Sequence, residues 1–257
     1  MQIIHHHKGK LILLAILLLG WLAKGQLHHL GPEIGSAETE LAKYFYLIES
    51  SFDPQLITRV PVGDSKLVAL TFDDGPDPVY TSQVLNILKE YRIKATFFVV
   101  GRSVLDHPEL IRQEVAAGNE VENHTYTHPN LNQDSNTKTT QEISEGEAAI
   151  TSVTHKKPHY FRPPRGLFTK ETIDVAADKG YKVVLWSICV EHERSKTPVD
   201  MANRVIKAAR PGTIILAHDG RLNRSRTMAA LPLIIEGYQR KGYRFVTLDE
   251  MVKKERL

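Results

Sequence analysis

The sequence contains one cysteine, Cys189, among 257 residues. A single cysteine excludes an intrachain disulfide framework and a zinc site built from cysteine ligands, so any metal site must use histidine and carboxylate ligands. The composition is otherwise ordinary, with 42% hydrophobic and 25% charged residues. These values exclude a disordered chain, a collagen-like rod and a polytopic membrane protein, and they predict one sizeable globular domain.

The sequence also lacks a large excess of one charge. It has 33 Lys and Arg against 30 Asp and Glu, and Lys8, Lys10 and Lys24 lie in the first 25 residues, which contain no acid. The rest of the chain is therefore formally neutral. We expect no nucleic-acid partner, because bulk positive charge is absent.

Long hydrophobic runs are missing as well. The longest apolar stretch, residues 11–23, has 13 residues and follows Lys8 and Lys10. As a helix it would span about 20 Å, short of the hydrocarbon core of about 30 Å. Residues 1–25 are therefore predicted to be a signal peptide, with residues 23–25 as cleavage site, or an N-terminal membrane anchor. Either places the remainder outside the cytoplasm, secreted or membrane-attached.

Two further regions follow. Residues 26–63 have weak periodicity and are predicted to be a spacer with a docking segment. Residues 64–257 alternate short apolar runs with amphipathic stretches, which predicts an α/β domain with a parallel sheet. Helix signals include Thr197 before Pro198, and Gly118 and Gly180 as helix ends. The candidate strands, about seven, lie at 66–72, 94–100, 120–123, 159–162, 182–187, 213–217 and 243–248.

Chemically useful side chains lie at or just after the carboxyl ends of the predicted strands. They are Asp73, Asp74, His124, Arg162, Trp186, Cys189 and His218. In a parallel barrel the carboxyl ends of all strands meet on one face, whereas an open sheet brings together only strands near its switch point. The pattern therefore favours a (β/α) barrel with its active site at the carboxyl ends of the strands.

Two segments supply candidate metal ligands. Asp73 and Asp74 are adjacent carboxylates that disfavour joint ionisation unless a cation or donors lie nearby. His124 and His128 are spaced so that both imidazoles reach one side of a helical turn or a tight loop. One aspartate and two histidines leave a fourth position open, which is the composition of a catalytic zinc site.

Each segment also has a structural interpretation. Asp-Asp-Gly-Pro is a common turn, and the histidine pair can be incidental in a chain with 12 histidines. Arg162 can orient an ionised Asp73 or lie in a solvated, proline-stiffened loop. His218 can cap a strand, and Trp186 can be a core residue or a wall on which a sugar stacks.

Four segments in order, TFDDGP, HTYTH, RPPRG and LAHDG, resemble the polysaccharide deacetylase family, also called carbohydrate esterase family four, over residues 66–252. The resemblance implies a distorted (β/α) barrel and metal-dependent removal of acetyl groups from N-acetylated sugars. It implies that Asp74, His124 and His128 bind a divalent metal, with zinc expected and cobalt or nickel compatible with the same ligands.

The resemblance also implies catalytic roles. Asp73 would be the general base, oriented by Arg162, and His218 would be the general acid that protonates the departing amine. A substrate groove is expected along Pro163, Arg165 and Trp186. The partner implied is an N-acetylated glycan.

Two departures from the family pattern stand out. Arg165 occupies a position where the family commonly has an aromatic residue, although the family uses the backbone N–H there. The residues after Trp186 lack the aspartate that orients the acid histidine, and Glu191 or Glu193 is a candidate replacement.

The leading hypothesis is therefore an N-deacetylase that acts on a cell-wall or other extracellular polysaccharide, such as peptidoglycan or a chitin-like polymer. The alternatives are a glycan-binding pseudoenzyme, because of the altered segment after Trp186, and an O-acetyl esterase of the same family, which needs the acid histidine less because an alkoxide leaves more easily than an amine anion.

Overall fold

A computed structural model describes residues 56–255. The predicted signal peptide or anchor, residues 1–25, and most of the predicted spacer lie outside these residues. Within the described part, no helix combines the length and apolarity needed to cross a membrane.

The described chain alternates strands with helices. The strands are β1 (Leu56–Ile57), β2 (Leu67–Asp73), β3 (Thr96–Val99), β4 (Glu120–Asn123), β5 (Tyr160–Phe161), β6 (Lys182–Val184), β7 (Ile188–Cys189), β8 (Ile214–His218) and β9 (Arg244–Val246). The helices are α3 (Tyr80–Tyr91), α4 (Gly101–Asp106), α5 (Pro108–Ala116), α6 (Asn136–Thr154), α7 (Lys170–Asp178), α8 (Pro198–Lys207), α9 (Ser225–Arg240) and α10 (Leu248–Glu255). Two 3₁₀ turns, Leu131–Gln133 and Pro164–Gly166, complete the list.

The strands form one nine-stranded sheet in the order β1-β6-β5-β4-β3-β2-β8-β7, with β9 also paired to β2. Every strand pair is parallel. The chain after β1 spans from β6 to the start of β8: Leu185 donates to the Ile57 carbonyl at 2.8 Å, and Val60 donates to the Gly212 carbonyl at 3.0 Å. The chain after β1 therefore bridges the two sides of the strand order, and the predicted distorted barrel is confirmed.

All seven predicted strands are present, and each predicted end lies within three residues of the observed one. The two strands that the sequence did not predict, β1 and β7, have two residues each. Such short segments carry no periodic pattern, and tertiary pairing creates them. β1 falls within the segment predicted as spacer, so the last residues of that segment pair with the sheet.

Strand β2 lies at the centre of the sheet, and all seven of its residues are buried. Its alternating side chains enter two cores. Val68, Leu70 and Phe72 pack outward with apolar residues of the surrounding helices. Leu67 and Ala69 point into the barrel, where the apolar side of α10 also packs. Burial on both faces explains the uninterrupted apolar run of this strand.

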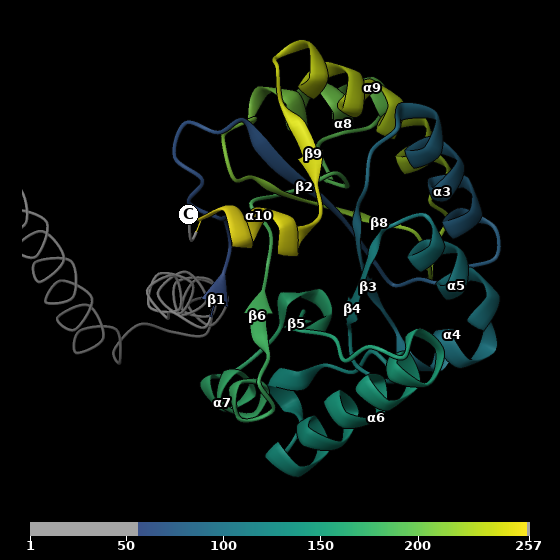
Figure 1. The fold of residues 1–257 in the computed structure, drawn as a ribbon, viewed down its shortest axis with the longest axis vertical. Coiled ribbons are helices and arrows are strands. Elements are labelled where there is room, and N and C mark those ends of the chain that lie inside the picture. The colour runs from purple at the N-terminus through teal and green to yellow at the C-terminus, as the bar shows by residue number, and fades with distance from the viewer. Residues whose placement is uncertain (1–55, 256–257) are drawn as a thin grey trace, which may run out of the picture. The chain divides into compact units, whose positions relative to one another are not determined.

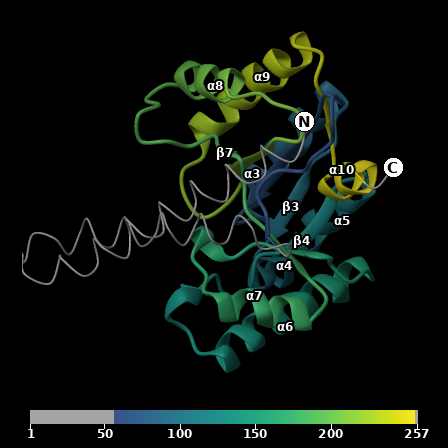
Figure 2. The ribbon, with the colours of Figure 1, turned by 90° about the vertical axis from the view of Figure 1, so that its left-hand side faces the viewer.

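Helices α3–α9 surround the strands, and α10 crosses the barrel end that faces the viewer in Figure 1. The Leu248 N–H of α10 donates to Thr96 Oγ1 at the start of β3, so α10 covers the amino ends of the strands. The carboxyl ends are left for the candidate site. Figure 2 shows α8 and α9 at one end of the molecule and α6 and α7 at the other.

The predicted helix boundaries agree with the structure. Thr197 caps α8 by accepting a hydrogen bond from the Asp200 N–H, with Pro198 at the first helical position. Gly118 and Gly180 follow α5 and α7 with positive φ.

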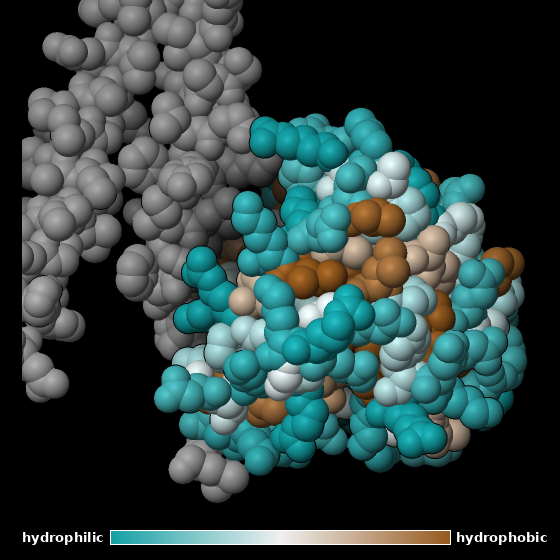
Figure 3. Space-filling view, turned by 90° about the horizontal axis from the view of Figure 1, so that it is seen from above, coloured by the Kyte–Doolittle hydropathy of each residue, from teal (hydrophilic) through white to brown (hydrophobic). Residues whose placement is uncertain are grey.

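The face seen from above is mostly hydrophilic with a band of hydrophobic side chains across it (Figure 3).

Candidate active site

The first part of the site forms where β2 and β8 end side by side. Asp73 and His218 are paired across the two strands. Asp74 follows with φ 78°, a left-handed conformation. A Cβ on Gly220 would lie 2.3 Å from the Asp74 carbonyl oxygen. Glycine at position 220 therefore permits the close approach that places the Asp74 turn against the end of β8.

The two histidines lie on a tight loop after β4, one of the two arrangements that their spacing predicts. Thr125 and His128 adopt positive φ values of 69° and 63°. Glu142 of α6 supports the loop by accepting hydrogen bonds from the Tyr126 and Thr127 N–H groups at 3.1 and 2.8 Å. The loop is therefore fixed by hydrogen bonds to a helix, which directs both imidazoles toward Asp74.

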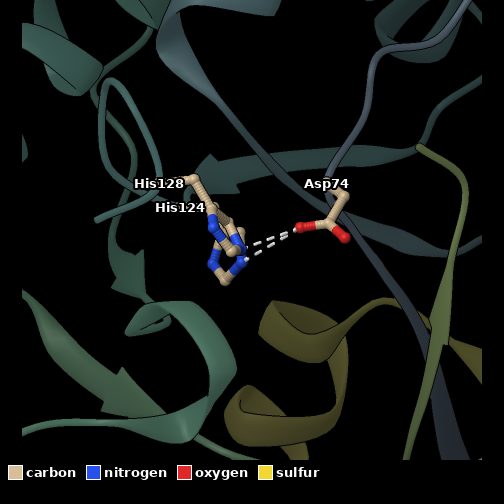
Figure 4. Close-up of side chains that lie close together, drawn as sticks. All are labelled: Asp74, His124 and His128. Carbon is tan, nitrogen blue, oxygen red and sulfur yellow. Dashed lines mark ion pairs between the residues drawn. The ribbon is translucent and has the colours of Figure 1, made fainter. Parts of the chain in front are cut away.

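Asp74, His124 and His128 form a compact cluster of oxygen and nitrogen ligands (Figure 4). Asp74 Oδ1 lies 3.0 Å from His128 Nε2 and 3.8 Å from His124 Nε2. All three side chains are buried. Asp74 Oδ1 has no hydrogen bond of suitable geometry from the described residues. A buried carboxylate oxygen that faces two imidazole nitrogens fits a divalent cation.

The tautomer of His124 suits a metal ligand. Its Nδ1 lies 2.7 Å from the Arg162 carbonyl oxygen, which can only accept, so Nδ1 carries the proton and Nε2 presents a lone pair to the cluster. Burial lowers the pKa of His124 to about 4, against the opposing effect of Asp73 and Asp74. The imidazole is therefore neutral near pH 7.

Asp74 is held ionised by its neighbours. Burial alone would raise its pKa, but the contact with His128 and the electrostatic interactions with His124 and His218 outweigh burial and lower the pKa. Arg224 of the α9 amino end donates from Nη2 to Asp74 Oδ2 at 3.1 Å. Arg224 thus binds the second carboxylate oxygen, Oδ2, and leaves Oδ1 facing the histidines.

Asp73 lies beside this cluster and is paired with Arg162. Arg162 Nη1 donates to Asp73 Oδ1 at 2.6 Å and to Thr71 Oγ1 at 2.9 Å. The rest of the guanidinium donates to the carbonyls of Val184 and Leu185. Because Arg162 is fully buried with its donors satisfied, it fixes the orientation of Asp73.

His218 lies on the other side of Asp73 and is oriented by Glu191. Glu191 Oε2 accepts from His218 Nδ1 at 3.1 Å, and Glu191 Oε1 accepts from the Thr227 hydroxyl at 2.6 Å. Glu193 is exposed, so of the two glutamates considered, Glu191 contacts His218. Burial would lower the pKa of His218, but the hydrogen bond and charge of Glu191 outweigh it and raise the pKa.

A pocket joins these groups. It is lined by Asp73, Asp74, His124, His128, Arg165, Trp186, Leu216, His218, Arg221, Leu222 and Arg224. Two of the three predicted groove residues, Arg165 and Trp186, line it, while Pro163 is buried beside them outside the lining. Arg221 and Arg224 could not be predicted as pocket residues from the sequence, because their positions after the His-Asp-Gly segment follow no recognised spacing.

The fold and the site together define a parallel (β/α)-barrel protein with an Asp-His-His cluster, suited to a metal ion, beside a paired carboxylate and a paired histidine. Residues 61–184 match the Polysaccharide deacetylase family. A peptidoglycan-N-acetylglucosamine deacetylase of Bacillus cereus is 39% identical over 210 residues, which cover 80% of this chain and 98% of that protein. The chain belongs to the polysaccharide deacetylase family, as the four sequence segments predict.

Solved structures agree with this assignment. A peptidoglycan N-acetylglucosamine deacetylase superimposes with a TM-score of 0.74 at 30% identity, over 77% of this chain and 93% of that one. A family-four pseudoenzyme from Bacillus anthracis superimposes with a TM-score of 0.72 at 30% identity, over 80% of this chain and 71% of that one. The curated relatives include peptidoglycan-N-acetylglucosamine and chitooligosaccharide deacetylases, which are hydrolases of carbon–nitrogen bonds, and they confirm the predicted enzyme class.

Proposed function

We propose that this protein is a metal-dependent N-deacetylase of N-acetylated sugars in a cell-wall or other extracellular polysaccharide. One observation carries the proposal: a buried Asp-His-His cluster, an arginine-paired Asp73 and a glutamate-paired His218 line the same pocket. The family relatives support the same chemistry. The predicted signal peptide or anchor in residues 1–25 agrees with action outside the cytoplasm, either secreted or membrane-attached.

Asp74, His124 and His128 would hold the metal, with zinc favoured by the two nitrogen ligands and one oxygen ligand, and with cobalt or nickel compatible. When bound, the ion supplies a Lewis acid that makes a water more acidic and polarises the acetamide carbonyl. The structural contribution of Arg224 is to hold the second oxygen of Asp74, which keeps Oδ1 directed at the two imidazoles.

Asp73 is assigned the role of general base. Its carboxylate lies beside the cluster, and Asp73 Oδ2 is 3.7 Å from His124 Nε2. Arg162 binds Oδ1, so Oδ2 is the oxygen available to accept a proton from the attacking water. The backbone N–H of Arg165, on the loop after β5, is assigned the role of donating a hydrogen bond to the oxyanion that forms as the carbonyl is attacked.

His218 is assigned the role of general acid. An amine anion is a very poor leaving group, so the departing nitrogen must be protonated as the bond breaks. Glu191 binds Nδ1 and leaves Nε2 to donate that proton. Since Glu191 raises the pKa of His218, a larger fraction of the imidazole is protonated near neutral pH.

Glu191→Gln is expected to move the alkaline limb of the pH dependence of kcat/KM to lower pH. Activity needs His218 protonated, and loss of the Glu191 charge lowers the pKa of His218. The exposed Glu193→Gln variant is the matched control and should retain the wild-type profile. An unshifted alkaline limb in Glu191→Gln would contradict the role given to Glu191.

The substrate class is tested by acetate release from peptidoglycan and from N-acetylglucosamine oligomers, with an O-acetylated sugar as comparison. We expect amide cleavage that a chelator abolishes and that His218→Ala reduces far more than any ester cleavage. Unchanged amide cleavage in His218→Ala would overturn the acid assignment. Glycan binding without acetate release, in protein with bound metal, would establish the pseudoenzyme alternative instead.

A further inference from the structure

We propose that Arg165 and Arg221 form a carboxylate-binding subsite at the rim of the pocket, so that the preferred glycan carries a carboxylate on the deacetylated sugar or its neighbour. This inference rests on the proposed N-deacetylase function and narrows its substrate class. It depends on four observations: the place of the two arginines, the charge balance of the pocket, the contacts of Arg165 and the backbone conformation at both positions.

The two arginines reach the pocket from different parts of the barrel. Arg165 lies in the turn Pro164–Gly166 after β5, and Arg221 lies in the loop after β8. In the sheet, β5 and β8 are separated by β4, β3 and β2. Both side chains nevertheless line the same pocket as the metal-ligand cluster, and both residues are exposed. A sugar in this pocket would therefore meet guanidinium groups belonging to two separate strand ends.

The two aspartates that line the pocket, and the glutamate that binds His218, already have cationic partners. Asp73 pairs with Arg162 at 2.6 Å, Asp74 with Arg224 at 3.1 Å, and Glu191 with His218 at 3.1 Å. A divalent ion in the Asp-His-His cluster would add further positive charge. The charges of Arg165 and Arg221 are therefore surplus, and a neutral acetamido sugar gives them no partner, whereas a carboxylate does.

Neither arginine is occupied by a close ion pair. Arg221 Nε lies 3.9 Å from Asp74 Oδ1, a long contact to a carboxylate that Arg224 already binds. Arg165 has no carboxylate partner within residues 56–255, and Arg165 Nη1 donates to Asn130 Oδ1 at 2.6 Å. Asn130 orients the guanidinium, and the remaining N–H groups can make the two parallel bonds that a carboxylate accepts.

Both arginines also occupy backbone positions that favour glycine. Arg165 has φ 58° and Arg221 has φ 69°. The left-handed conformation is unfavourable for residues with a Cβ, so each guanidinium is kept at the rim despite a backbone cost. Strain at two positions that face the same pocket fits a role for the side chains themselves.

Two kinds of glycan offer this chemistry: an N-acetylhexosamine chain with a lactyl ether carboxylate, as in peptidoglycan strands freed of peptide, and a chain that alternates N-acetylhexosamine with a uronic acid. Calorimetry with the zinc-loaded full chain distinguishes them. The probes are short oligosaccharides of each kind, the same oligosaccharides with the carboxylate converted to a methyl amide, and a neutral N-acetylglucosamine oligomer of equal length.

We expect at least one carboxylate probe to bind about 10- to 100-fold more tightly than its amide, the range expected for charge-assisted hydrogen bonds. The ratio should fall with added salt. The ratio of carboxylate to amide affinity should fall toward one in the double variant Arg165→Gln/Arg221→Gln. It should recover in part when both arginines are replaced by lysine. Arg112→Gln, an exposed position on α5 outside the pocket, is the matched control and should keep the wild-type ratio.

A wild-type ratio near one for both carboxylate probes, or a ratio that survives in the double glutamine variant, would overturn the subsite. Acetate release is recorded on the same probes as a separate readout. Carboxylate preference in binding without acetate release from any probe would support the subsite and count against the N-deacetylase function. Acetate release with no carboxylate preference would support the function and reject the subsite.

Discussion

Asp74→Asn is expected to abolish stoichiometric zinc binding and to reduce acetate release by more than about 10³-fold. The substitution keeps the shape of the side chain but removes the negative charge that faces His124 and His128. Two neutral imidazoles and an amide attract a divalent cation far less strongly than two imidazoles and a carboxylate. The measurements are metal content after dialysis and acetate release at saturating substrate.

Two further variants complete this test. Asp106→Asn changes an exposed aspartate outside the pocket and should retain both metal and activity. His128→Gln removes a ligand without leaving the buried Arg224 charge unpaired, so it covers the case in which Asp74→Asn is destabilised. Full zinc occupancy in a folded Asp74→Asn or His128→Gln variant would contradict the assignment of the ligands.

Asp73→Asn is expected to lower kcat by about 10²- to 10⁴-fold while zinc content stays near that of the wild type. The asparagine oxygen can still accept from Arg162, but the side chain can no longer take a proton. Because the fully buried Arg162 loses its charged partner, the folding of the variant is measured alongside its activity. Retention of metal separates this variant from Asp74→Asn. The assay is acetate release with parallel metal analysis.

Two outcomes would count against Asp73 as the general base. A kcat near the wild-type value in Asp73→Asn would show that another group removes the proton. A loss of zinc together with activity would instead make Asp73 a metal ligand, in spite of its pairing with Arg162 at 2.6 Å.

Much of the fold could be predicted from the sequence because its strongest signals are local. Continuous apolar runs mark strands such as β2 that are buried on both faces, and Thr197 with Pro198 marks the start of α8. The strands β1 and β7 could not be predicted, because a segment of two residues shows no hydrophobic periodicity. Their pairing depends on residues elsewhere in the chain.

The candidate site could likewise be predicted only in part from the sequence. Asp74, His124 and His128 could be proposed as neighbours because the carboxyl ends of parallel strands converge. The choice between Glu191 and Glu193 could not be made, since it depends on which side chain of one loop turns toward β8. Arg224 could not be identified, because its contact with Asp74 joins residues 150 positions apart.

The central claim, that one metal ion held by Asp74, His124 and His128 enables this pocket to cleave an N-acetyl amide, is tested most directly by titrating metal-free full chain with zinc. Acetate release from peptidoglycan or N-acetylglucosamine oligomers is followed at each addition. The account predicts no activity in the metal-free protein, a linear rise with added zinc, and a plateau at one equivalent. Amide cleavage in the metal-free protein, or one bound equivalent of zinc with no cleavage of either substrate, would contradict it.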